Sequence, residues 1–241
     1  MPLAKLVQRF IASTAMKTWV LLSWLLASSS IGAQTNNACG SLVNYAFGPY
    51  DYRVATPGQK SLVENAHFTA GVEFLQTRKT GTFGHDIGYT LRAFPNHPRA
   101  LMAMQQLVEK EKRNPAEDAP YTIDCFYERA LRFRPDDYVV RLLYVSFLIG
   151  RGELKEVPAH LAYVSETEAD NAFAMYNLGL VYFDLKDYGQ SLAYAHKAMQ
   201  LGLARPDLKA KLERLNKWAD PAPVAATDAA SKPEANASGV P

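Results

Sequence analysis

Residues 171–203 read NAFAMYNLGLVYFDLKDYGQSLAYAHKAMQLGL, and this stretch decides the fold. Apolar and aromatic residues recur at three- and four-residue steps in both of its halves: Leu178, Tyr182 and Leu185, then Leu192, Ala195 and Met199. This spacing is typical of amphipathic helices, so we expect two helices here. Asp187 lies in the short polar turn between them and is a suitable N-cap for the second helix. Gly179 has no side chain and Ala198 a small one, so the two helices can approach closely at these positions.

The same stretch carries a recognisable motif. It runs Asn-Leu-Gly-x-x-Tyr from residue 177, Asp-Tyr from residue 187 and Ala-x-x-Leu from residue 198, and it resembles a unit of the tetratricopeptide (TPR) family. The resemblance implies an all-α fold, a TPR-like α-α helical solenoid. Proteins of this family usually bind extended peptides or partner helices on the concave face of the solenoid.

TPR units recur with a period of about 34 residues, so earlier units are sought at that spacing. One step back, residues 138–171 form a second unit with its turn at Gly152-Glu153-Leu154. A further step of 34 residues takes the position of Val164 to Ala130, which lies in the expected second helix of an earlier unit. The six additional residues of that unit fit the polar loop from Arg113 to Pro120, since loops tolerate insertions. We therefore expect three TPR-like repeats within residues 98–205.

The regions outside the repeats have different characters. We expect an irregular N-terminal arm (34–63), a degenerate first repeat or N-terminal cap (64–97), a capping helix (206–218) and a disordered Ala/Pro-rich tail (219–241). In the arm, Tyr50 and Tyr52 are expected to be buried against the helices. Short helices are expected at residues 70–77 and near residues 85–94. The capping helix should cover the last repeat with four apolar side chains: Leu208, Leu212, Leu215 and Trp218.

The segment 1–33 has the form of a secretory signal peptide. It carries Lys5, Arg9 and Lys17 with no acidic residue, then an apolar run from Trp19 to Ala27 that is shorter than the roughly 20 residues of a membrane span. Cleavage after Ala33 would leave a periplasmic or secreted protein. The formal charge of +2 then falls to about −1, and no basic tract remains, so nucleic acid is not expected as a partner.

Two cysteines remain in the chain after Ala33, Cys39 and Cys125. In an oxidising compartment an even number of cysteines favours a disulfide, so we expect them to pair. Two free thiols are the alternative, and lipid attachment at Cys39 is a further one, although Asn36 and Asn37 do not suit a lipid-attachment sequence. Neither cysteine has another Cys or a His at ligand spacing, so no metal is expected.

The sequence has no pattern typical of an enzyme. Its five histidines form no i,i+4 pair, and it lacks nucleophile motifs and phosphate-binding glycine loops. The neighbours His85 and Asp86, in a glycine-rich segment, could be an active site, but a turn with capping residues fits them better. We therefore expect a non-enzymatic protein without a cofactor, and an enzyme that uses the N-terminal segment remains one alternative.

The recurring feature is a groove along the first helix of each pair. Its expected lining comes from three units: Arg99, Met102, Gln106, Lys110, Val139, Leu142, Leu143, Ser146, Gly150, Phe173, Tyr176, Asn177, Leu180 and Asp184. Asn177 is the leading candidate, because its amide can both donate to and accept from a peptide backbone. The arm could instead cover the apolar residues Val139 and Leu142. The expected function is a monomeric protein–protein interaction scaffold or adaptor of the bacterial cell envelope, with a solute-binding accessory of a transport system as the other alternative.

Overall fold

The computed structural model describes residues 39–43 and 47–221. The chain divides into two units, Met1–Asn36 and Asn37–Pro241, and every described residue belongs to the second. The signal peptide therefore lies outside the described residues, as does the tail from residue 222 onward. No helix in the described ranges is long and apolar enough to cross a membrane.

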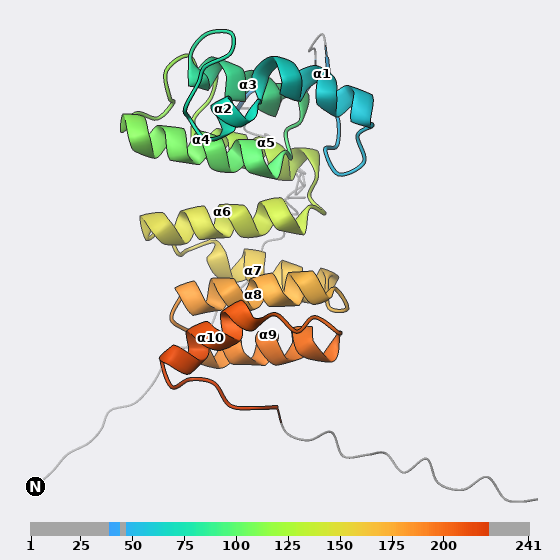
Figure 1. Cartoon of the computed structure of the whole chain (residues 1–241), viewed down its shortest axis with the longest axis vertical. Coiled ribbons are helices and arrows are strands. Elements are labelled where there is room, and N and C mark those ends of the chain that lie inside the picture. Colours follow the sequence, from blue (N-terminus) through green and yellow to red (C-terminus); the bar gives the residue numbers. More distant parts are fainter. Residues whose placement is uncertain (1–38, 44–46, 222–241) are drawn as a thin grey trace, which may run out of the picture. The chain divides into compact units, whose positions relative to one another are not determined.

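The fold is all-α, as predicted: the described residues contain helices and no strand (Figure 1). The helices are α1 (Pro57–His67), α2 (Ala70–Glu73), α3 (Phe83–Ala93), α4 (Pro98–Glu111), α5 (Ile123–Phe133), α6 (Tyr138–Arg151), α7 (Val157–Thr167), α8 (Ala172–Asp184), α9 (Tyr188–Gln200) and α10 (Pro206–Arg214). Each packs against the next in the sequence from α2 to α10, and α1 packs against α3. Contacts also join α2 to α4, α4 to α6 and α6 to α8. Helix pairs are thus layered in sequence order, whereas a TPR-type superhelix stays a prediction.

Helices α8 and α9 form the tightest of these pairs, and their contact confirms the prediction made at Gly179. A Cβ atom at Gly179 would lie 2.7 Å from Cδ2 of Leu208 and 3.3 Å from the Ser191 carbonyl oxygen. The Ser191 hydroxyl donates to the Gly179 carbonyl at 2.8 Å, and Ala198 is fully buried. Asp187 caps α9 as predicted, since its carboxylate accepts from the Gln190 amide. The absence of a side chain at residue 179 is what lets α9 and α10 reach α8.

The irregular arm ends earlier than predicted. Residues 57–63 belong to α1, which begins at Pro57 behind a capping box formed by Thr56 and Gln59. In this arrangement the Thr56 side chain accepts from the Gln59 amide, and the Gln59 side chain accepts from the Thr56 amide. Proline is favoured in a first turn, so the segment Thr-Pro-Gly-Gln starts a helix rather than extending a loop.

Two other helices are shorter than predicted. Helix α2 is a single turn that ends at Glu73 instead of residue 77. Helix α10 ends at Arg214 instead of residue 218, and Leu215 beyond it is 44% exposed. Leu208 and Leu212 are buried as expected, and Trp218 packs at the edge of the same core. The cap therefore covers the last pair with three of its four predicted apolar side chains.

The described part of the arm is fastened to α5 and α3. The sulfur atoms of Cys39 and Cys125 are 2.00 Å apart, the distance of a disulfide bond, so the predicted pairing is present. Arg129 of α5 donates to the carbonyls of Cys39 and Ser41. Further along, Tyr50 and Tyr52 pack on a small apolar cluster around Phe94, where they are half-buried rather than fully buried.

Candidate functional site

A groove lies between α6 and α8, with one wall from α10. It has a volume of about 290 Å³, and nine residues line it: Val139, Leu142, Leu143, Ser146, Asn177, Leu180, Val181, Asp184 and Lys211. Seven of these are among the residues that the repeat offset predicted. Positions related by that offset do lie on neighbouring helices here, because α6 and α8 pack against each other.

Apolar side chains form most of the groove surface, and Asn177 and Ser146 are its uncharged polar residues. Asn177 is half-buried on α8, and its amide makes no hydrogen bond to any other described residue. Because Asn177 is only half-buried, a ligand that bonds with its amide replaces a hydrogen bond to water, and this exchange contributes about 0.5–1.5 kcal/mol to binding. The nearby Ser146 hydroxyl already donates to the Leu142 carbonyl, but its oxygen can still accept.

The groove also contains one group of each charge. Asp184 is the last residue of α8, and Lys211 comes from α10. Within the described chain neither of them forms an ion pair, although the Lys211 ammonium lies 5.3 Å from the centre of the Phe183 ring. Both charges are therefore available to a ligand that lies along the groove.

The other predicted site residues do not join this groove. Arg99, on α4, is paired with Glu73 at 3.0 Å and Glu64 at 3.6 Å. Met102, Gln106 and Lys110 are exposed on the same helix, and Gly150 of α6 is exposed outside the groove lining. The α4 side chains therefore present a separate surface rather than a continuation of the groove.

Phe173 and Tyr176 of α8 also lie away from the groove lining. Phe173 is 55% exposed. Tyr176 is buried, with the Arg205 guanidinium 5.5 Å from its ring centre, and burial raises the pKa of its hydroxyl. Its position under the segment before α10 makes Tyr176 a packing residue, so the prediction that it lines the groove is wrong.

None of the groove-lining residues comes from the described part of the arm. That part instead lies against α3 and α5, through the Tyr50 amide bonded to the Ala93 carbonyl and through Cys39. The alternative in which the arm covers Val139 and Leu142 is therefore not what residues 39–43 and 47–56 do. The lining residues that sequence reasoning missed are Val181 and Lys211. Lys211 carried no signal, because it lies in the capping helix and outside the repeat register.

Of the neighbours His85 and Asp86, the aspartate holds the preceding loop in place through hydrogen bonds. The fully buried Asp86 carboxylate accepts from the amides of Lys79 and Thr80, from the Thr80 hydroxyl and from His67 Nδ1 at 3.1 Å. Burial acts to raise the pKa of Asp86, but these hydrogen bonds outweigh it and hold the pKa below its usual range. His85 is half-exposed, and its Nδ1 lies 3.9 Å from the carboxylate. The geometry thus uses Asp86 to hold the segment before α3.

Another cluster has the donor atoms of a metal centre. Cys39, Cys125 and Glu128 place their ligand atoms within 4.8 Å of one another, and no other group of three among the described residues is so arranged. Sequence reasoning considered only Cys and His partners, so it overlooked Glu128, which follows Cys125 by three residues on α5.

Comparison of the chain with known protein families, with characterised proteins and with solved structures finds no match in any of the three. The resemblance to TPR units therefore rests on the motif in residues 171–203 and on the offset between successive units. Its functional implications enter below as proposals.

Proposed function

We propose that this protein is a non-catalytic scaffold or adaptor that holds an extended segment of a partner protein in the groove between α6 and α8. The observation that carries the proposal is Asn177, an amide with no partner in the described chain, set among apolar side chains. An extended peptide offers backbone N–H and C=O groups that such an amide can bond with together.

The size of the groove favours a peptide over a small-molecule ligand. Its volume of about 290 Å³ lies at the lower limit of ligand pockets, which start at roughly 300 Å³. A peptide needs to insert only a few side chains and can continue along the surface. We expect a segment with apolar residues at the centre, an acidic group near Lys211 and a basic group near Asp184.

The proposed place of action is outside the cytoplasm, in the bacterial cell envelope. The disulfide-bonded pair Cys39 and Cys125 supports this location, because such bonds persist in oxidising compartments. The signal-like sequence of residues 1–33 supports it independently.

A peptide-display selection on the purified full chain tests the function. Selected peptides should share the expected pattern, and Asn177→Ala should weaken their binding about tenfold, since lost hydrogen bonds of this kind contribute about 1–1.5 kcal/mol. The matched control is Gln200→Ala, which removes an exposed amide from α9 outside the groove lining. Helix content measured by circular dichroism must be equal in all three proteins. Peptides that bind both variants as tightly as the unaltered chain would contradict the proposal.

A further inference from the structure

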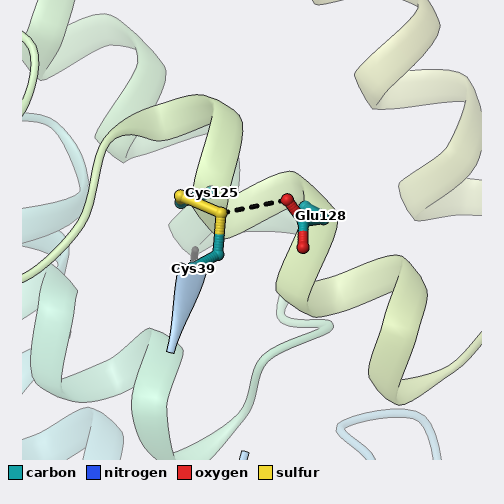
Figure 2. A group of neighbouring side chains, drawn as sticks. All are labelled: Cys39, Cys125 and Glu128. Atoms are coloured by element: carbon teal, nitrogen blue, oxygen red, sulfur yellow. Dashed lines mark hydrogen bonds between the residues drawn. A yellow bond between two sulfur atoms is a disulfide. The ribbon is translucent and has the colours of Figure 1, made fainter. Parts of the chain in front are cut away.

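A cleft beside α5 contains the disulfide and the carboxylate of Glu128. The cleft has a volume of about 510 Å³, and its lining includes Cys39, Cys125, Glu128 and His160. Figure 2 shows the Glu128 carboxylate directed at the sulfur of Cys39. This cluster is separate from the proposed peptide groove, with which it shares no lining residue.

The contact between Glu128 and the disulfide is electrostatically unusual. Oε2 of Glu128 lies 3.0 Å from Sγ of Cys39, but a disulfide sulfur has no proton to donate. The contact therefore places a carboxylate oxygen beside a sulfur atom that becomes a thiolate once the disulfide is reduced, and a cation bound between two such anionic groups is attracted by both. The salt bridge from Arg132 reaches the other oxygen, Oε1, at 3.4 Å, so it leaves Oε2 directed at the sulfur.

The backbone positions the three side chains as a set of ligands. Cys125 and Glu128 are three residues apart on α5, so their side chains lie on the same face of the helix. Cys39 arrives from the arm, where Arg129 and Arg132 hold its neighbours by donating to the carbonyls of residues 39, 40 and 41. These guanidinium groups also favour negatively charged thiolates nearby. The ligand atoms stay within 4.8 Å of one another in this arrangement.

We propose that reduction converts the disulfide into a Zn²⁺ site with Cys39, Cys125 and Glu128 as ligands. A dithiol reductant reduces the bond to two thiols and is itself oxidised to a disulfide. The two thiols then lose two protons as they bind one Zn²⁺, and Glu128 binds as the carboxylate. Two thiolates and one carboxylate are a donor set that suits zinc. This proposal differs from the sequence prediction of no metal, which took only Cys and His spacing into account.

Three protein ligands would leave one of the four positions of a Zn²⁺ ion to be filled by water. His160 lines the cleft, but its Nδ1 already accepts from the Arg141 guanidinium at 3.0 Å. In the neutral ring the proton is then on Nε2, which leaves His160 no free nitrogen for the metal. Three protein ligands with one open position distinguish this site from closed structural zinc sites, which have four.

The test is a metal titration of the full chain in both redox states. The chain is reduced with dithiothreitol, freed of it without oxygen, and titrated with Co²⁺, whose thiolate charge-transfer absorption reports sulfur ligation. The reduced chain should bind one Co²⁺ that Zn²⁺ displaces, and the disulfide form should bind none. Glu128→Gln should weaken binding at least about tenfold. Glu156→Gln removes another carboxylate of the same cleft and should leave binding unchanged.

Several results would overturn the proposal. They are a reduced chain that binds no more metal than the disulfide form, a Glu128→Gln variant that binds as tightly as the unaltered chain, or equal losses in Glu128→Gln and Glu156→Gln. If reduction alone lowers the helix content, Zn²⁺ should restore it in the unaltered chain and not in Glu128→Gln. A helix signal that Zn²⁺ fails to restore would likewise count against the site.

Discussion

A pair of glycine substitutions tests the packing of α8 against α9 and α10. Gly179 and Gly150 both lie within helices, so replacing either by alanine gains up to about 1 kcal/mol of helix propensity. Their surroundings differ. The new Cβ at residue 179 would lie 2.7 Å from Leu208 Cδ2 and 3.3 Å from the Ser191 oxygen, whereas nothing lies within 4 Å of a Cβ at residue 150.

The comparison isolates the cost of crowding. The Leu208 methyl can rotate away, but the Ser191 carbonyl belongs to the α9 backbone and can yield only if the helix shifts. Overpacking of this kind costs about 1–3 kcal/mol, so Gly179→Ala should be less stable than Gly150→Ala by that amount. For a chain of this size the difference corresponds to about 2–12 °C in Tm. Gly179→Leu should be destabilised further.

Thermal and urea unfolding, followed by circular dichroism, measure this difference. Gly150→Ala should be slightly more stable than the unaltered chain and Gly179→Ala less stable than Gly150→Ala. Equal stability of the two variants would refute the argument that the missing side chain at residue 179 permits the close helix contact.

Two other predictions concern a buried histidine and the disulfide. His97 is fully buried, where its Nδ1 accepts from the Ala100 amide, and burial lowers its pKa to about 4 despite Glu64. As the pH falls, the unfolded chain therefore binds a proton at this histidine at a higher pH than the folded chain does, so the free energy of unfolding should fall by about 3 kcal/mol between pH 6.5 and pH 4. Urea unfolding midpoints of the unaltered chain and of His97→Asn measure this pH dependence. Equal pH dependence of the two proteins would contradict the assignment. Replacing both Cys39 and Cys125 by Ser opens a covalent loop that spans 86 residues and should lower the free energy of unfolding by about 2–4 kcal/mol; urea unfolding measures the loss, and an unchanged midpoint would show that the bond does not restrain the unfolded chain.

Local sequence signals predicted the α8–α9 helix pair well and the segment before α3 less well. Asp187 and Gly179 act within one helix pair, and the structure confirms both, because caps and close contacts depend on neighbouring residues. The start of α1 was also encoded locally, in the Thr56–Gln59 capping box, but residues 57–63 were expected to belong to the irregular arm. The sequence therefore contained the signal for this helix start.

The candidate site shows where such reasoning reaches its limit. The offset between repeat units found Asn177 and Leu142, because it reports which positions recur on successive helices. It could not find Lys211, which enters the groove from α10, a helix that the predicted repeats do not include. It also placed Tyr176 in the groove, because a helical offset does not reveal that the Arg205 segment covers this ring. Contacts made by non-repeating segments depend on the tertiary path of the chain.

Helix α10 has two roles, and these couple ligand affinity to the integrity of the C-terminal end. Leu208 and Leu212 bury its inner face, while Lys211 between them contributes to the groove. A partner that engages Lys211 would bind only molecules in which α10 is docked, so its binding would raise the free energy of undocking by RT ln(1 + L/Kd), where L is the free partner concentration. Conversely, a substitution that loosens α10 lowers affinity without touching the ligand. Slower hydrogen exchange at the α10 amides would therefore report that the groove is occupied.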